Sequence, residues 1–184
     1  MKEEKIYTFI ADTPLGKIQA AAQEGAISGL WFIGQKYFPA GTEKWNNKPD
    51  YPVFISLKAW LNDYFAGGKP EIIFPLSPAG TDFQQSVWKL LKKIPYGKTT
   101  TYGAIAARLS SNGKKAAAQA VGGAVGHNPI SLLIPCHRVL GADGSLTGYA
   151  GGLEKKSALL ELENKDCEGT IEQELRRFPN KSAF

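Results

Sequence analysis

The sequence predicts a small α/β unit over residues 1–76, a linker over 77–81 and a mainly helical unit over 82–165 that contains a helix-turn-helix. Three observations carry this prediction. In the first part, short apolar stretches typical of strands are separated by turn signals. In the second part, apolar residues recur at helical spacing, and the stretch SPAGT lies between the two patterns. A chain of 184 residues is long enough for two small domains that share an interface. The remaining tail, 166–184, is mixed in charge and carries no recognisable motif.

The first unit begins with short apolar stretches, KIYTFIA, GKIQAAA and ISGLWFI, which are separated by turn signals. This pattern predicts a small, mostly antiparallel sheet. Residues 34–50 carry Gly, Pro, Asn and charge, and we expect a loop there. Apolar residues then recur at helical spacing from Leu57 to Phe65, and Gly67-Gly68 ends that helix. The stretch EIIF, directly before a proline, predicts a further strand.

The second unit begins where Thr81 and Gln84 fit a capping box at the start of a helix. Beyond the turn PYGK, Thr101 is placed to cap a short helix that runs to Leu109. A third helix, KKAAAQAVGGAV (114–125), follows the break SSNG. Two helices joined by a short Gly-containing turn predict a helix-turn-helix, although helical hairpins that bind nothing share this pattern.

The third helix has an unusual face with almost no side chain, which is formed by Ala116, Ala117, Ala120 and Gly123. A glycine inside a helix costs about 1 kcal/mol relative to alanine, so this composition needs a reason. One reason is close packing against another helix or strand, which the sequence slightly favours. The other is close approach to a large rigid ligand such as a DNA groove.

The charge and composition bound the class of protein. The formal net charge of +5 favours an anionic partner. The apolar runs are too short to span a membrane, and the N-terminus has no apolar signal region, so we expect a cytoplasmic protein, or a nuclear one in a eukaryote. Two cysteines and two histidines without a close ligand pair predict no metal site and no disulfide framework. We expect no cofactor.

The stretch LIPCHRVLG places Cys136 and His137 side by side, followed by Arg138. A lone intracellular cysteine is most often a buried small hydrophobe. Here SLLI predicts a short strand that Pro135 ends, and cationic neighbours favour the reactive thiolate. Adjacent side chains on a strand point to opposite faces, so a direct Cys–His pair requires a turn or a bridging water.

A neutral histidine base needs an acceptor that holds its other ring nitrogen. LEKKSALLELE (153–163) predicts a helix with Leu159 toward the core, and Glu163 lies four positions later on the same side. Glu163 is therefore the candidate acceptor. The alternative is a solvated carboxylate at a helix end.

These motifs, taken together, carry a resemblance to a known family. Residues 81–163 resemble the DNA-binding and active-site domain of the O6-alkylguanine-DNA alkyltransferases, through PCHRV, an upstream Asn-Pro and a downstream GYxGG. The first half resembles that family's ribonuclease H-like N-terminal domain in length and layout. The resemblance also implies a winged-helix-like second domain.

The resemblance implies a role for each catalytic candidate. Cys136 is the alkyl acceptor, His137 draws its proton through a water, and Glu163 orients His137. Tyr102 matches the tyrosine that holds the flipped-out base and donates a proton to its ring. The remaining substrate- and DNA-binding positions are Asn128 as the hinge, Tyr149 and Ala150 in the substrate loop, Arg138 within the motif, and the backbone of Val139.

The resemblance also places the third helix in the minor groove, where Ala117, Ala120 and Gly123 admit close approach. Gln119 falls where many members have an arginine that fills the gap left by the extruded base. Ala150 replaces a serine of some members. The zinc-binding residues of some relatives' N-terminal domains have no counterpart here.

The function that follows is direct repair of DNA. A methyl or larger alkyl group moves from O6 of guanine, and from O4 of thymine if that base is accepted, to Cys136 in one irreversible turnover. The expected partner of this monomer is double-stranded DNA that carries the lesion. One alternative is a module that binds lesions without repairing them, as some relatives with Trp at the nucleophile position do. Another is a cysteine hydrolase with Cys136 and His137 as its dyad.

Overall fold

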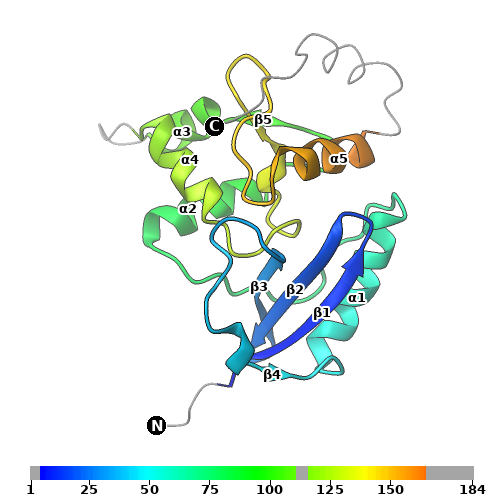
Figure 1. The fold of residues 1–184 in the computed structure, drawn as a ribbon. Coiled ribbons are helices and arrows are strands. Elements are labelled where there is room, and N and C mark those ends of the chain that lie inside the picture. Colours follow the sequence, from blue (N-terminus) through cyan, green and yellow to red (C-terminus); the bar gives the residue numbers. More distant parts are fainter. Residues whose placement is uncertain (1–4, 111–115, 165–184) are drawn as a thin grey trace.

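The computed structural model describes residues 5–110 and 116–164 (Figure 1). A mostly antiparallel sheet with one covering helix forms the first part, and a group of helices and loops packs against one edge of this sheet. The predicted strands are confirmed as β1 (Tyr7–Thr13), β2 (Gly16–Gln23) and β3 (Ala26–Phe32). The predicted helix is confirmed as α1 (Pro52–Phe65).

Strand β2 is the centre of the N-terminal core. The sheet order is β3-β2-β1-β4, and residues 18–22 of β2 are buried on both faces. Helix α1 packs over β1 and β2 on one face, where it buries Phe54 and Leu57. Trp31, on β3, lies against Phe38 and Trp45 from the following segment. One edge of the sheet, β3, meets the second unit, where Leu30 bridges Ile130.

Two expectations for the first unit need correction. The predicted loop at 34–50 contains a short 3-10 helix (Thr42–Lys44) and strand β4 (Asn46–Asn47), which pairs parallel to β1. EIIF is not a strand: Ile73 is 82% exposed, and the first ladder contact comes at Leu76, which bridges Ile27 of β3. Prolines flank this stretch, and they remove the backbone donors that a ladder needs.

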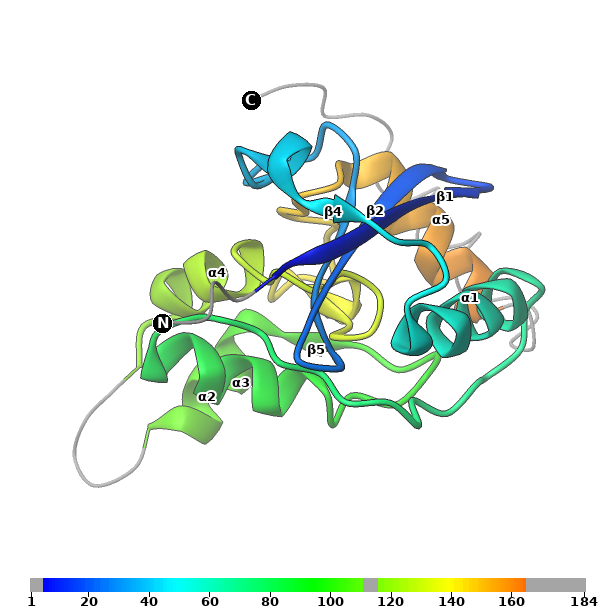
Figure 2. The ribbon, with the colours of Figure 1, turned by 90° about the horizontal axis from the view of Figure 1, so that it is seen from below.

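The second unit contains α2 to α5. Thr81 and Gln84 form the predicted capping box of α2, and Thr101 accepts a hydrogen bond from the Ala104 N–H at the start of α3. Helices α2, α3 and α4 pack side by side (Figure 2). None of the described helices is long and apolar enough to cross a membrane. The helix bounds are Asp82–Leu91 for α2, Tyr102–Leu109 for α3, Ala118–Gly126 for α4 and Leu153–Glu163 for α5.

Helix α4 begins later than the sequence predicts. Ala116 and Ala117 precede the helix, and Ala117 is its N-cap in an extended conformation. Lys114 and Lys115, with which we expected the helix to open, lie outside the described residues.

The predicted strand SLLI is also wrong, and the reason locates the site. Residues 131–134 form a tight turn in which Leu132 adopts a positive φ of 69°. Just before this turn, Ile130 bridges Leu30, with Leu30 N donating to Pro129 O and Ser131 N to Leu30 O. The segment therefore extends the edge of β3 for a single bridge and then turns into the second unit.

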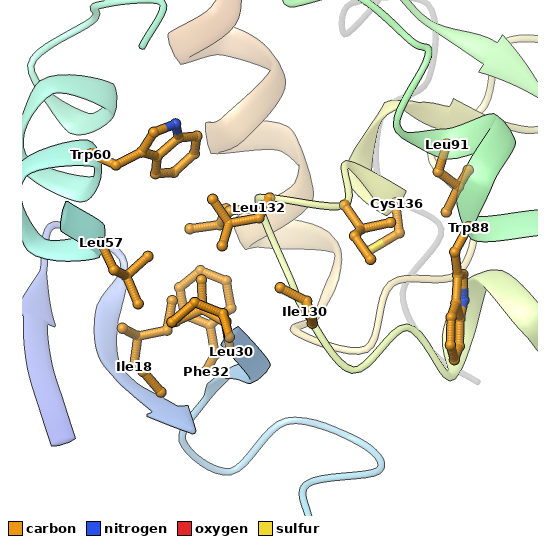
Figure 3. Packing of buried hydrophobic residues seen from close by; sticks show 14 of the residues in the cluster. Ile18, Leu30, Phe32, Leu57, Trp60, Trp88, Leu91, Ile130, Leu132 and Cys136 are labelled. Atoms are coloured by element: carbon orange, nitrogen blue, oxygen red, sulfur yellow. The ribbon is translucent and has the colours of Figure 1, made fainter. Parts of the chain in front are cut away.

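One continuous hydrophobic cluster joins the two units (Figure 3). Leu132 lies between Trp60 of α1 and the segment that carries Cys136, while Trp88 and Leu91 of α2 lie on the far side of Cys136. All five side chains are buried. The turn that precedes Cys136 is thus fixed by packing from both units.

Candidate active site

The thiol, the imidazole and the guanidinium leave the backbone on a single turn of 3-10 helix, Cys136–Arg138. This turn follows Pro135 and precedes β6 (Val139–Leu140), which pairs parallel to β5 (Thr100–Thr101). Because the backbone turns here, Cys136 and His137 do not point to opposite faces of a strand. All three residues of the turn are buried.

Asn128 holds the thiol and the backbone around it. Its Nδ2 donates to Ile134 O at 2.7 Å and to Cys136 Sγ at 3.1 Å, and its Oδ1 accepts from Ile130 N at 3.0 Å. The residue thus bridges the end of α4 to the reactive segment, which is the hinge position expected from the sequence.

Cys136 is a free, buried thiol. Burial raises its pKa, while the Asn128 hydrogen bond and the Lys156 charge oppose the rise. The sequence predicts that the cationic neighbours of Cys136 favour its thiolate form. For Arg138 this prediction is wrong, because its guanidinium is paired with Glu163. The resting thiol keeps its proton near neutral pH, so a base has to remove it for reaction.

Glu163 is the acceptor at the centre of the site, and its side chain is fully buried. Its Oε1 accepts from Tyr64 OH at 2.7 Å, His137 Nε2 at 2.7 Å and Arg138 Nη2 at 2.8 Å. Its Oε2 accepts from Arg138 Nε at 2.8 Å and Gly97 N at 3.2 Å. The solvated alternative is therefore wrong for Glu163. Burial alone raises the pKa of this carboxyl, but these hydrogen bonds and charges hold it well below its ordinary value.

The carboxylate sets the state of His137. Glu163 is ionised, so the proton between them belongs to Nε2, and Nδ1 is left as the acceptor. Nδ1 is buried and has no hydrogen-bond partner within residues 5–110 and 116–164. Burial lowers the pKa of His137, and Glu163 opposes this effect. The imidazole is thus neutral at pH 7, with a free acceptor nitrogen.

Arg138 does not lie where a DNA-contacting residue would lie. It is 9% exposed, and its guanidinium pairs with Glu163, donates to Ile94 O at 2.7 Å and lies 5.7 Å from the ring centre of Tyr96. The expectation that it binds substrate or DNA is therefore corrected: the carboxylate and the carbonyl occupy its donors inside the protein.

Tyr102 faces the loop that carries the substrate candidates. Its hydroxyl donates to Thr147 O at 3.0 Å and lies 3.3 Å from Gly148 O, and burial raises its pKa. Because β5 ends at Thr101 and pairs with β6, Tyr102 begins α3 next to the segment that follows Cys136. The phenol keeps its proton and is available as a donor.

Lys156 is a site residue that the sequence did not reveal. It is fully buried on α5, and its Nζ donates to Val139 O at 2.5 Å and Thr147 O at 2.6 Å. Burial lowers its pKa to about 8, while Cys136 opposes the change. The ammonium links the substrate loop to β6, and it occupies the backbone carbonyl of Val139, a residue whose backbone the resemblance assigns to substrate binding.

Tyr149 and Ala150 connect the substrate loop to the N-terminal unit. Tyr149 OH is buried with no hydrogen-bond partner among the described residues, and burial raises its pKa well above the ordinary value. Ala150 O accepts from Lys36 N at 2.9 Å. A Cβ added at Gly151 would lie 2.7 Å from the Tyr149 ring, so a larger residue there would displace this ring.

The small face of α4 is exposed. Ala117, Gln119, Ala120 and Gly123 all face solvent, and a Cβ added at Gly123 would meet no atom within 4 Å. The sequence slightly favours close packing against another helix or strand as the reason for these small residues. That interpretation is wrong, because the residues face solvent. Ala116 alone among the expected positions is half-buried. The helix presents a nearly flat surface beside the site.

The fold and the site together define a protein with a buried thiol on the same turn as a carboxylate-bound imidazole, and with an exposed face on the neighbouring helix α4. A family model described as 6-O-methylguanine DNA methyltransferase, DNA binding domain, matches residues 82–165. A model described as the ribonuclease-like domain of the same enzyme matches residues 5–78.

Curated relatives agree with the family models. The methylated-DNA–protein-cysteine methyltransferase of Mycobacterium bovis is 48% identical over 152 residues, which span 83% of this chain and 88% of that protein. The enzyme of the same name from Haemophilus influenzae is 42% identical over 159 residues, which span 85% of each chain. The chain belongs to the 6-O-methylguanine DNA methyltransferase family.

A solved structure gives the same result in three dimensions. Mycobacterium tuberculosis OGT in complex with DNA matches with a TM-score of 0.77 at 43% identity, over 86% of this chain and 93% of that one. The fold also matches the O6-methylguanine DNA methyltransferase of Methanococcus jannaschii, with a TM-score of 0.62 at 23% identity over 96% of this chain and all of that one.

Proposed function

We propose that this protein repairs DNA by moving an alkyl group from O6 of guanine to Sγ of its own Cys136. The observation that carries the proposal is the buried free thiol on the same turn as a neutral imidazole, one nitrogen of which is held by an ionised carboxylate. Membership of the family supports the reaction, because its curated members are named for methyl transfer from DNA to a protein cysteine. We place the activity in the cytoplasm, or in the nucleus of a eukaryotic cell.

The first step is removal of the thiol proton. His137 Nδ1 is the acceptor, and a water passes the proton to it from Sγ. Glu163 stabilises the imidazolium that forms, because it already holds Nε2–H. Asn128 Nδ2 donates to the sulfur as its charge develops. The thiol thus becomes a soft nucleophile only when the base accepts its proton.

The second step is an in-line displacement at the alkyl carbon. The S–C bond forms while the C–O6 bond breaks, and the electron pair of that bond stays with the guanine. Tyr102 supplies a proton to the departing base, and the imidazolium proton later restores the phenol through solvent. In balance, the thiol proton ends on guanine and the alkyl group on sulfur. Water does not cleave the thioether, so each molecule acts once.

The base has to leave the duplex to reach Cys136, which lies inside the protein. The exposed small face of α4 supports binding in a narrow minor groove, where backbone can approach closely. Asn128 follows α4 directly and contacts Sγ, so the helix that meets DNA is tied to the thiol. The Tyr102 hydroxyl has to leave Thr147 O and Gly148 O as the base enters.

The test mixes the protein with a short duplex that contains one O6-methylguanine and records the intact protein mass and the modified peptide. We expect a gain of one methyl group per molecule, located on Cys136, followed by no further turnover. No gain in mass together with tight lesion binding would support a non-repairing module instead. Release of more product than protein present would support a hydrolase.

A separate prediction concerns Gln119, which is exposed on α4. A residue has to fill the gap left by the extruded guanine, because an empty gap forfeits stacking worth a few kcal/mol. We expect Gln119→Gly to slow repair of duplex DNA by about tenfold, or about 1.4 kcal/mol. Reaction with free O6-benzylguanine needs no base extrusion and should barely change. The two single-turnover rates measure this difference.

The matched control for Gln119→Gly is Ala118→Gly, which adds a glycine to the same exposed turn without removing a gap-filling side chain. We expect this variant to react like the parent on both substrates. Gln119→Arg should bind duplex DNA more tightly, with a salt dependence steeper by about one phosphate contact. Equal slowing of Gln119→Gly on both substrates would show that Gln119 shapes the pocket instead.

A further inference from the structure

Tyr64 brings the N-terminal unit into direct contact with the reaction machinery. It lies on α1, is 1% exposed, and its hydroxyl lies 2.7 Å from Glu163 Oε1, across 99 positions of sequence. Glu163 is ionised and has no proton to give, so the phenol is the donor. Burial is the main cause that raises the pKa of Tyr64, and Glu163 adds to it, so the donor keeps its proton.

The ring of Tyr64 is held on several sides. Trp60 stacks on it with ring centres 4.9 Å apart and planes 11° apart, and the edges of Phe65 and Tyr96 meet it at 5.3 and 6.0 Å. A phenol fixed in this way places its hydroxyl with little freedom. The oxygen that it reaches, Oε1, is the one that accepts from His137 Nε2.

We propose that Tyr64 is a positioning residue for alkyl transfer: its hydroxyl fixes Glu163 Oε1 and takes up part of its charge, and this contact limits the basicity of His137. The inference rests on the proposed function and goes beyond it. It means that α1, from the ribonuclease-like unit, sets the pH range over which Cys136 can be deprotonated.

The direction of the effect follows from the shared oxygen. Removal of the phenol hydroxyl leaves Oε1 with fewer donors, so its hydrogen bond to His137 strengthens and favours the imidazolium. The pKa of His137 therefore rises. Other groups around the pair stay in place in such a variant. They are Arg138 and Cys136 on the same turn, Lys156 on α5, Tyr96 beside Gly97, and Tyr149 in the substrate loop.

The experiment is the pH profile of the single-turnover rate for Tyr64→Phe, measured with duplex O6-methylguanine DNA. Rate is lost at low pH when His137 becomes protonated, so a higher pKa moves the acid limb to higher pH. We expect an upward shift of about 0.5 to 1 pH unit, the size that one net hydrogen bond supports. Tyr51→Phe is the control, because it removes a phenol hydroxyl that accepts from Gly25 N on the same unit.

A second variant guards against simple loss of fold. Site-specific 3-fluorotyrosine in place of Tyr64 keeps the shape and makes the phenol a stronger donor. The acid limb should then move to lower pH, opposite to Tyr64→Phe. A merely structural role would change stability without moving the acid limb in opposite directions.

The outcomes separate the inference from the proposed function. If the unmodified protein takes up no methyl group at any pH, the proposed function fails. If the unmodified protein does take up a methyl group, and both Tyr64 variants lose rate at the same acid pH as the unmodified protein, only the inference about Tyr64 is overturned. An equal shift in Tyr51→Phe would also overturn the inference, because the effect would not depend on Glu163.

Discussion

Replacement of Cys136 by serine is expected to abolish alkyl transfer while the protein keeps its fold and its affinity for DNA. Serine is close to cysteine in shape, and Asn128 Nδ2, 3.1 Å from Sγ, can donate to the new hydroxyl. The serine hydroxyl is far less acidic and less polarisable than a thiol, so His137 cannot generate a comparable nucleophile. Phosphate contacts generally supply much of a protein's affinity for DNA, and we expect them on exposed helices, so a change at the buried Cys136 should leave them intact.

The measurement for Cys136→Ser is intact mass after incubation with methylated duplex, together with a binding titration on the same DNA. Cys167→Ser is the matched control, although Cys167 lies outside the described residues. It should take up one methyl group at the parental rate. If Cys167→Ser alone stopped transfer, Cys136 would not be the acceptor.

The sequence predicts the chemistry better than the loops that hold it. The adjacent thiol and imidazole of Cys136 and His137 mark this segment by pattern alone, whereas Glu163, which shares a helix side with Leu159, is only a candidate by pattern and gains its role from the family resemblance. The strands β1 to β3 and the helices are predicted correctly because their apolar residues alternate or recur at helical spacing. SLLI is apolar enough for a strand, but packing of Leu132 between the two units favours a turn with positive φ. Local pattern cannot show such a tertiary preference.

Tyr64 and Lys156 could not be assigned from sequence. Tyr64 recurs at helical spacing with Leu57 and Trp60, so the pattern marks it as an ordinary core residue. Lys156 stands in a charged pair that is typical of a solvated helix face, yet it is fully buried among carbonyls. Both act through contacts with distant segments, and these contacts exist only after the two units have packed together.

The packing of the two units also ties the site to the N-terminal unit. Residues 129–131 pair with the edge of β3, Ala150 O accepts from Lys36 N, and Tyr64 reaches Glu163. Each contact joins the N-terminal unit to a segment that carries a substrate or catalytic candidate. The ribonuclease-like unit therefore supports the site through several of its segments at once.

The other large effect is expected at Glu163. Glu163→Gln leaves the buried Arg138 without an anion, and loss of one partner of a buried pair costs about 3–5 kcal/mol of folding free energy. The variant should also slow alkyl transfer by about 10² to 10⁴-fold, the range that general acid–base catalysis contributes. Urea unfolding and single-turnover rates measure the two effects.

The pH dependence of stability gives an independent check on Glu163. The folded-state pKa of this carboxyl is held well below its ordinary value, so its stabilisation is fully present above the unfolded value of about 4.3. That stabilisation is lost as pH falls below about 4.3 toward the folded pKa. Glutamine does not titrate, so the stability gap between parent and Glu163→Gln should narrow in this range. A gap that stays constant down to acid pH would contradict the ion pair.

The two roles of Glu163 can be separated by the double variant Glu163→Gln/Arg138→Met. Methionine removes the unpaired buried charge, and an apolar replacement of a buried pair is often neutral in stability. We expect the double variant to recover most of the lost folding free energy, because position 138, which is 9% exposed, then carries no buried cation without a partner. Its transfer rate should stay as low as that of Glu163→Gln, because glutamine cannot stabilise the imidazolium of His137. Recovery of rate together with stability would instead show that Glu163 acts only by holding the fold.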